Sequence, residues 1–290
     1  FDDYFGSKPF PIRQLIALLS RGESDLYCPT FNLGFPMYLY YQPLPHLAAA
    51  ALSLASFGLL DAQGAFNLLL VLLNGAYPLA VYRGLRAFEA PADEGPGQAG
   101  PAGLDPLTPL LAAFCAPLVA SSLTFGFTTH SVMALGLYTQ TWAMVIFPLA
   151  LGAGWRATAA GIGRAPAGGA RERPREVLSG AAWLLLLSLC HVFYAVALGT
   201  ALVVAVLCRP PLRDMVRGLS RLAVMASVVA LSLAFWLIPL FITRDFAGGW
   251  PWGGVDRWQG YGVVRVASQL FSGRLFDLGQ LPAITIGLLV

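Results

Sequence analysis

The sequence predicts an all-α protein, a polytopic transmembrane helix bundle with juxtamembrane helices on its outer face. Of the 290 residues, 57% are hydrophobic and only 11% are charged, and the mean hydropathy is +0.67. A soluble domain carries about 25% charged residues, so this composition leaves too little polar surface to cover a soluble fold. Several apolar runs also approach the length of about 20 residues that a helix needs to cross a bilayer. We therefore expect an integral membrane protein.

Charge and cysteine usage narrow the class further. The net charge of +3 gives no support to a nucleic-acid-binding protein. The four cysteines show no metal-type spacing, so we expect neither a metal–thiolate site nor an obligatory disulfide. The chain begins at Phe1 and ends at Val290 inside an apolar run, so we expect one membrane domain over 1–290 that is a fragment of a longer protein.

The first predicted element is an amphipathic helix in the segment PFPIRQLIALLSRG, residues 9–22. Apolar residues repeat on one side of it at helical spacing: Ile12, Leu15, Ile16 and Leu19. Pro11 suits its first turn and Gly22 suits its end. The helix is too short to span a bilayer. Two interpretations are open, a helix lying on the membrane surface and a helix packed on the protein itself.

The next segment, FPMYLYYQPLPH at 35–46, combines three prolines with four aromatic residues. Its prolines predict an extended course and then a helix that begins near Leu44, in a juxtamembrane stretch 44–60. Tyr38, Tyr40 and Tyr41 have two interpretations. They are either an aromatic belt at the membrane interface or one wall of a cleft for a sugar or a lipid.

The distribution of basic residues predicts the membrane spans and their direction. Cytoplasmic loops carry the excess of arginine and lysine, and the loops 83–106, 156–176 and 208–221 hold 11 of the 18 basic residues. This choice requires the long apolar run 177–207 to be a helical pair hinged near His191. The expected spans lie near 64–82, 107–124, 138–155, 177–190, 191–207 and 219–242, with a further span starting at 281–290. The segments 1–63 and 243–280 then lie outside.

The expected spans contain almost no ionisable residue, apart from His191 and Arg221. Ion-coupled transporters need titratable groups near the membrane midplane, so a transporter is disfavoured and the chemistry is expected in the outer segments. Asp2 and Asp3 there can supply a general base or hold a divalent ion, or they are simply part of a solvated loop. His191 is either a satisfied polar residue or a donor to a phosphate.

The second outer segment, RDFAGGWPWGGVDRWQGYG at 244–262, is rich in aromatic residues, glycines and charges. Aromatic faces beside guanidinium and carboxylate groups suit a sugar or a lipid phosphate, which arginine can bind through two hydrogen bonds. Interfacial anchoring with flexible turns is the other interpretation. The candidate binding residues in this segment are Arg244, Trp250, Trp252, Asp256 and Arg257.

An outer acidic pair, an amphipathic helix and GFPMYLYYQPLPH together resemble the type C integral-membrane glycosyltransferases. Within these, residues 1–60 look most similar to bacterial multi-spanning proteins described as 6-pyruvoyl-tetrahydropterin synthase-related, a name that implies no pterin chemistry. Weaker similarities lie at 138–152, 187–195 and 235–252. The resemblance implies a sugar donor linked to polyprenyl phosphate, an acidic catalytic residue at Asp2 or Asp3, and a site on the extracytoplasmic face.

We therefore expect a multi-pass protein of a bacterial inner or plasma membrane that transfers a sugar from a polyprenyl-phosphate donor. Arg244, Arg257 or His191 would stabilise the departing phosphate. The alternative is a non-catalytic membrane protein of the cell envelope that binds a lipid-linked saccharide or assists polysaccharide assembly. The expected partners are the lipid bilayer and the lipid-linked sugar. The cofactor is unknown, and a divalent cation is left open.

Overall fold

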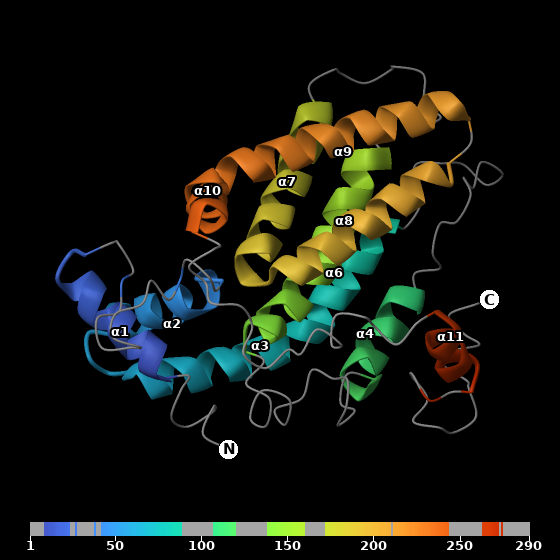
Figure 1. Ribbon diagram of the computed structural model, residues 1–290. Coiled ribbons are helices and arrows are strands. Elements are labelled where there is room, and N and C mark those ends of the chain that lie inside the picture. Colours follow the sequence, from blue (N-terminus) through green and yellow to red (C-terminus); the bar gives the residue numbers. More distant parts are fainter. Residues whose placement is uncertain are drawn as a thin grey trace. The chain divides into compact units, whose positions relative to one another are not determined.

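The computed structural model describes residues 9–23, 27, 38, 42–88, 107–119, 138–159, 172–209, 211–243, 263–272 and 274 (Figure 1). Every regular element within these ranges is helical, which confirms the all-α prediction. The helices are α1 (Pro9–Ser20), α2 (Leu44–Ala55), α3 (Ala62–Leu85), the short η3 (Arg86–Phe88), α4 (Leu107–Val119), α6 (Tyr138–Ala159), α7 (Glu172–Cys190), α8 (Val192–Leu207), α9 (Leu212–Ser232), α10 (Ala234–Thr243) and α11 (Val263–Phe271).

The chain divides into two units, Phe1–Phe241 and Ile242–Val290. The first contains α1 to α9 and most of α10. The second contains α11, on which Val264 and Phe271 are exposed. The expectation of a single membrane domain over the whole chain stays a prediction.

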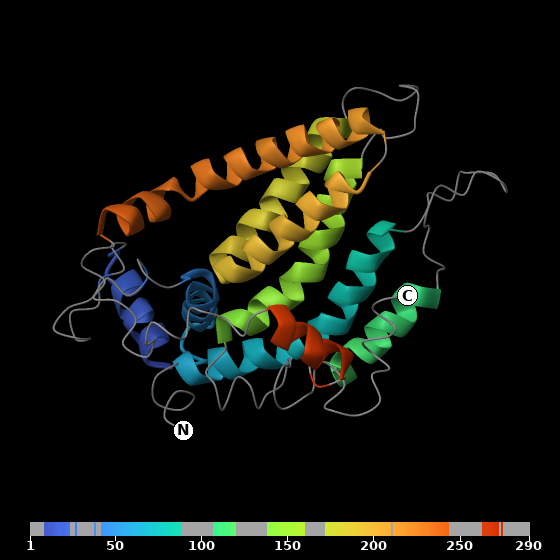
Figure 2. The same ribbon diagram turned by 45° about the vertical axis from the view of Figure 1, so that its right-hand side comes forward.

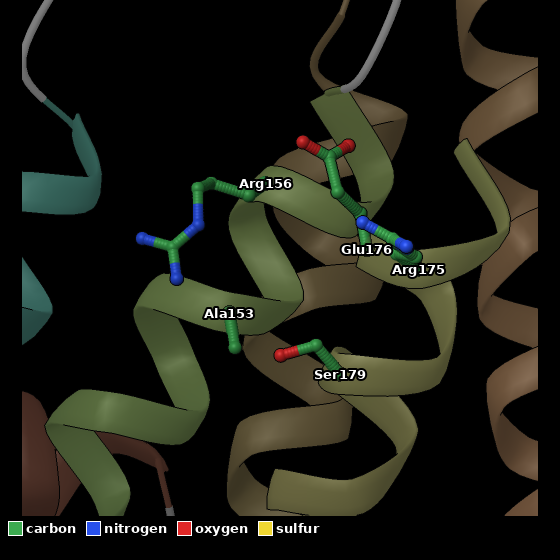
Figure 3. A pocket seen from close by; sticks show the side chains of 5 residues that line it. All are labelled: Ala153, Arg156, Arg175, Glu176 and Ser179. Atoms are coloured by element: carbon green, nitrogen blue, oxygen red, sulfur yellow. The ribbon is translucent and has the colours of Figure 1, made fainter. Parts of the chain in front are cut away.

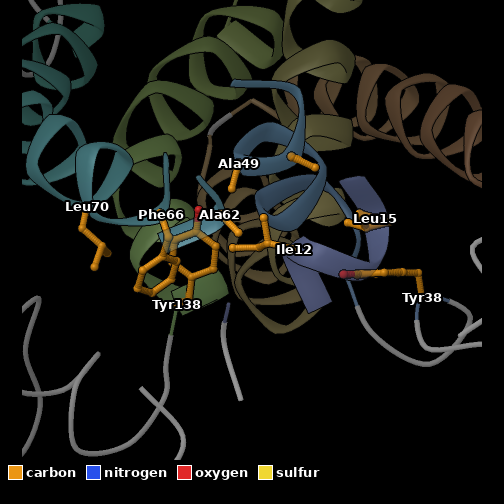
Figure 4. Close-up of a cluster of buried hydrophobic side chains, with 9 residues drawn as sticks. Ile12, Leu15, Tyr38, Ala49, Ala62, Phe66, Leu70 and Tyr138 are labelled. Atoms are coloured by element: carbon orange, nitrogen blue, oxygen red, sulfur yellow. The ribbon is translucent and has the colours of Figure 1, made fainter. Parts of the chain in front are cut away.

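Helix α1 packs against the protein through its apolar side. Ile12 and Leu15 are fully buried, in a cluster with Ala49 of α2 and Phe66 of α3 (Figure 4). Of the two interpretations of this amphipathic helix, packing on the protein is therefore the one that the structure shows. The helix ends as predicted at Gly22, which has φ +74° and completes a Schellman motif in which the Glu23 and Gly22 amides donate to Leu18 and Leu19.

The turn between α2 and α3 is closed by side chains. Ser53 donates to the carbonyl of Leu60 at 2.7 Å. Asp61 caps α3, because its carboxylate accepts from the Gly64 amide at 2.7 Å. Phe57 in this turn has φ 54° and is 96% exposed. The turn thus holds a large apolar side chain outside the core of the first unit.

Small residues allow α3 and α6 to approach closely. A Cβ atom added to Gly152 of α6 would lie 2.6 Å from the carbonyl oxygen of Gly84 on α3. A Cβ atom added to Gly84 would overlap the carbonyl of Pro148 on α6. Interfaces built on small residues are common between membrane helices, where the backbones come into contact. The contact positions α3 directly against α6.

The long apolar run is divided at His191, as the distribution of basic residues required. Helix α7 ends at Cys190 and α8 begins at Val192, and His191 between them is extended, with φ −165° and ψ 105°. Helix α7 begins at Glu172 and is 19 residues long, five residues longer at its start than the expected span. Figures 1 and 2 both show α7 and α8 folded back on each other and packed with α9.

The last expected span of the first unit differs from the structure. The run 219–242 was expected to form one helix, but the backbone forms α9, which begins earlier at Leu212, and α10, which begins at Ala234. Leu233 separates them with φ −92° and ψ 0°. Pro239 in α10 lacks an amide donor, so the hydrogen-bond ladder after the break is incomplete. The hydropathy of the run does not register this division.

Two helices among the described residues are long and apolar enough to cross a membrane. They are Ala62–Phe88 and Leu212–Ser232. Their length and composition indicate membrane association. That the other expected segments also cross the membrane stays a prediction.

Candidate functional site

Two of the eleven residues that the sequence singled out are described by the structure, Tyr38 and His191. The remaining nine lie outside the described residues: Asp2, Asp3, Tyr40, Tyr41, Arg244, Trp250, Trp252, Asp256 and Arg257. That Asp3 and Arg257 share one outward-facing pocket therefore stays a prediction.

Tyr38 lies in the core beside α1. Its side chain is 4% exposed and belongs to the same buried cluster as Ile12 and Leu15 (Figure 4). Its ring centroid is 5.7 Å from that of His46. A structural role accounts for this position, and a role for Tyr38 in binding stays a prediction.

His46, the last residue of the proline-rich motif, connects that motif to α6. It is 2% exposed, and its ring lies 5.5 Å from the ring of Tyr138, at an angle of 78°. Tyr138 is fully buried and donates its hydroxyl to the carbonyl of Pro45 at 3.2 Å. The segments 35–46 and 138–152, which both carried the family resemblance, are thus in contact at these residues.

Tyr138 begins α6 and holds an aromatic cluster together. Its ring lies 4.6 Å from Phe66 of α3 and 6.4 Å from Trp142, one turn further along α6. Figure 4 shows the Phe66 and Tyr138 rings side by side. His46 and Tyr138 were not predicted from the sequence as site residues. The available signal was that both lie in segments quoted for the resemblance.

His191 lies at the corner between α7 and α8. It is half-buried and contacts the ring of Tyr194 at 5.2 Å and 77°. Its Nδ1 atom is inaccessible to solvent and has no hydrogen-bond partner among the described residues. An imidazole nitrogen can donate or accept a hydrogen bond, and a ligand would reach this one only after the side chains that cover it move.

The corner and the motif lie at the same end of the first unit. Trp142 packs against the cluster around Tyr138 and also against the cluster that contains Cys190. Leu44, at the start of α2, packs against the second of these clusters. Figures 1 and 2 both show α2 beside the corner of α7 and α8. We call this region the aromatic end, and its residues are Tyr38, His46, Tyr138, Trp142 and His191.

The carboxylates described near the aromatic end are already engaged. Asp61 caps α3, and Glu23 pairs with Arg21 at 2.8 Å. Hydrogen bonding to Arg21 lowers the pKa of the exposed Glu23 carboxyl. The assignment of the general base to Asp2 or Asp3 falls on residues outside the described ranges and stays a prediction. Within those ranges, no group of three potential metal ligands occurs.

The opposite end of α6 is basic. Arg221 donates to the carbonyl of Ala157 at 3.2 Å, and Arg209 donates to the Thr158 hydroxyl at 3.2 Å. The Arg209 guanidinium also lies 4.3 Å from the Trp155 ring centroid. Two arginines thus bind the last turn of α6, where unsatisfied carbonyls and the helix dipole favour positive charge. Burial and the nearby Arg221 lower the pKa of Arg209.

A small pocket lies between α6 and α7 at this end, with a volume of about 220 Å³ (Figure 3). Its lining residues are Ala153, Arg156, Arg175, Glu176 and Ser179. We call this region, with Arg156, Arg175, Arg209 and Arg221, the basic end. In the sequence, these arginines were only markers of membrane orientation.

Comparison with known proteins leaves the chain without a match. No protein-family model, no curated protein and no solved structure is similar to it.

Proposed function

We propose that this chain is a multi-spanning membrane protein of the type C glycosyltransferase architecture. The arrangement of side chains on its helices supports the membrane part of this proposal, and the resemblance of residues 1–60 is the ground for the architecture. Small residues are buried in α6: Ala143, Ala150, Gly152, Ala153, Gly154 and Ala157. Large apolar residues are exposed on other helices: Val71, Leu72 and Leu79 on α3, Val196, Val203 and Val204 on α8, and Phe235, Ile238 and Phe241 on α10. A helix surface with this many exposed apolar side chains is suited to contact with lipid.

The proposed orientation has the basic end in the cytoplasm and the aromatic end outside, as the positive-inside rule favours. Helix α6 joins the two ends. Its 22 residues rise about 1.5 Å each, so it is about 33 Å long, comparable with the ~30 Å hydrocarbon core of a bilayer. The protein would then belong to a bacterial inner or plasma membrane.

The orientation can be tested with single cysteines in a variant that lacks the four native ones. We expect Phe57→Cys, in the turn before α3, to react with a membrane-impermeant maleimide added outside. We expect Arg213→Cys, which is exposed at the start of α9, to react only after the membrane is permeabilised. Labelling of both cysteines from the same side would contradict the proposed topology.

At the aromatic end, we assign transfer of a sugar from a polyprenyl-phosphate donor. Asp2 or Asp3 would take the proton of an acceptor hydroxyl, whose oxygen attacks the anomeric carbon. The bond from that carbon to the phosphate oxygen breaks, and polyprenyl phosphate leaves with the bonding electron pair. The half-buried His191, with an unpartnered Nδ1 among the described residues, supports a donor to this phosphate in the corner.

The experiment is an assay of transfer from a labelled lipid-linked sugar by the purified protein. Positioned general-base catalysis contributes about 10²–10⁴-fold, so the double change Asp2→Asn and Asp3→Asn should reduce turnover by that factor. The matched control is Glu23→Gln, which removes an exposed carboxylate that pairs with Arg21. Unchanged turnover in the well-folded double variant would rule out these aspartates as the base.

A non-catalytic binder of lipid-linked saccharide is the second candidate. It is favoured by one observation, that the carboxylates described near the aromatic end cap a helix or pair with arginine. A binder would retain affinity for the lipid-linked sugar in the aspartate double variant and would show no transfer in the unaltered protein. The same assay, combined with a binding measurement, separates the two candidates.

A further inference from the structure

We propose that the pocket between α6 and α7 binds the phosphate of an anionic phospholipid headgroup. It lies at a membrane surface only if the chain spans the bilayer as proposed above, and it is independent of any transferase activity. Pockets for drug-sized ligands have volumes of about 300–1,000 Å³. At about 220 Å³, this one suits a small polar group rather than a complete metabolite.

The side chains that line the pocket have the chemistry of a phosphate site. Arg156 of α6 and Arg175 of α7 are exposed, and no described residue forms an ion pair with either. Guanidinium groups donate paired hydrogen bonds that match phosphate oxygens. Ser179 adds a hydroxyl donor. Figure 3 shows Ser179 directed from α7 toward Ala153 on α6, with both arginines nearer the helix ends.

The place of the pocket in the fold favours a lipid as the source of the phosphate. It opens where α6 ends and α7 begins, and α7 starts at Glu172, so Arg175 belongs to its first turn. The positive end of a helix dipole adds to the attraction for an anion there. Basic pockets between helices on the cytoplasmic side of a membrane are suited to anionic headgroups.

The other arginines of the basic end have different contacts. Arg209 and Arg221 bind the last turn of α6, and Arg217 pairs with Asp214 at 3.6 Å. Arg213 is exposed on α9 and does not line the pocket. It therefore serves as a control, because Arg213→Gln removes one guanidinium charge from the same end of the bundle without changing the lining of the pocket.

A change at Glu176 should affect the binding of an anionic headgroup in the opposite direction to the arginine changes. Its carboxylate is part of the lining and repels an anionic ligand, so the pocket carries two positive charges and one negative charge. Glu176→Gln keeps the shape of the side chain, replaces one acceptor oxygen by an amide NH2 donor, and removes the repulsion. This change should strengthen the binding of an anionic headgroup, whereas nonspecific loss of structure could only weaken it.

The experiment uses the full chain reconstituted in phosphatidylcholine vesicles that contain fluorescent phosphatidylglycerol. We expect the double change Arg156→Gln and Arg175→Gln to weaken phosphatidylglycerol binding about tenfold, or about 1.4 kcal/mol. Glu176→Gln should tighten binding, and Arg213→Gln should leave it unchanged. Circular dichroism of each variant checks that the helices are retained.

Four results would overturn the proposal. Equal weakening by Arg213→Gln and by the double change would mean that binding is spread over the basic surface. Complete competition by inorganic phosphate would identify free phosphate, rather than a lipid, as the ligand. Absence of phosphatidylglycerol binding, in a protein that stays in neutral phosphatidylcholine vesicles, would refute the pocket alone. Failure to stay in neutral vesicles would instead refute the membrane proposal, and the pocket site with it.

Discussion

The packing of α3 on α6 can be tested by comparing two glycines of the same helix. Gly84 is buried against Pro148 of α6, and a Cβ atom added there would overlap the Pro148 backbone carbonyl. Gly75, nine residues earlier in α3, has no heavy atom within 4 Å of an added Cβ. The two sites therefore differ in tertiary surroundings and share one helix. Gly84→Ala and Gly75→Ala form a matched pair.

The two substitutions should change the free energy of unfolding in opposite directions. Replacing glycine by alanine inside a helix stabilises it by about 0.8–1.0 kcal/mol, and Gly75→Ala should show this gain. At Gly84 the added methyl group meets a backbone carbonyl, which cannot move aside as a flexible side chain can. Overpacking typically costs about 1–3 kcal/mol, so after subtraction of the same propensity gain Gly84→Ala should be destabilised by up to about 2 kcal/mol.

The measurement is equilibrium unfolding of the purified protein in detergent, followed by circular dichroism. The two variants should lie on opposite sides of the unaltered protein. If Gly84→Ala were as stable as Gly75→Ala, the close approach of α3 and α6 would be wrong. The position of Phe88 beside Trp155, at a ring-centroid distance of 5.0 Å, would then be in question as well.

Two further predictions concern the aromatic end and the end of α1. Tyr138→Phe removes the hydroxyl that donates a hydrogen bond to the Pro45 carbonyl, and it keeps the ring. It should lower the free energy of unfolding by about 0.5–1.5 kcal/mol. The control is Tyr82→Phe, outside this cluster, which should lose less stability than Tyr138→Phe. The Arg21 hydrogen bond lowers the pKa of Glu23 below its ordinary value of 4.5. A carboxyl with a lowered folded-state pKa contributes stability above its unfolded pKa and loses it as the pH falls through the folded value. The unaltered protein should therefore lose this contribution below about pH 4.5, and Glu23→Gln should remove that part of the pH dependence; identical pH profiles for the two proteins would count against the pair. The effect is small, because both side chains are exposed.

Local patterns predicted several elements well. The spacing of Ile12, Leu15 and Leu19 indicated α1, and Gly22 indicated where it ends. The structure gives the reason, because the backbone at this position has φ +74°, a conformation that strongly favours glycine. The prolines of FPMYLYYQPLPH placed the start of α2 at Leu44, where the structure has it. The positions of arginine required a break near His191. Each of these signals acts within a few residues, or through the known preference of charge for one side of a membrane.

Other features depended on contacts between distant segments. The apolar side of α1 suits lipid as well as protein, and only the positions of α2 and α3 show that protein covers it. His46 and Tyr138 are 92 residues apart in the chain, and neither residue's immediate neighbours predict that their rings meet. The break at Leu233 was missed because the sequence is apolar on both sides of it. The proposed residues Asp2, Asp3 and 244–262 lie outside the described residues and stay predictions.

Three features could be read from the residues alone: the helical class, the low-charge composition suited to a membrane, and the segments that hold the arginines. These follow from residue chemistry and short-range periodicity, which need no knowledge of the partners of a helix. The packing of the helices distinguishes the arginines: Arg209 and Arg221 bind the end of α6, whereas Arg156 and Arg175 border a pocket. Arginines of identical chemistry differ in this way because packing brings some within reach of a carbonyl or hydroxyl and leaves others with their guanidinium groups exposed.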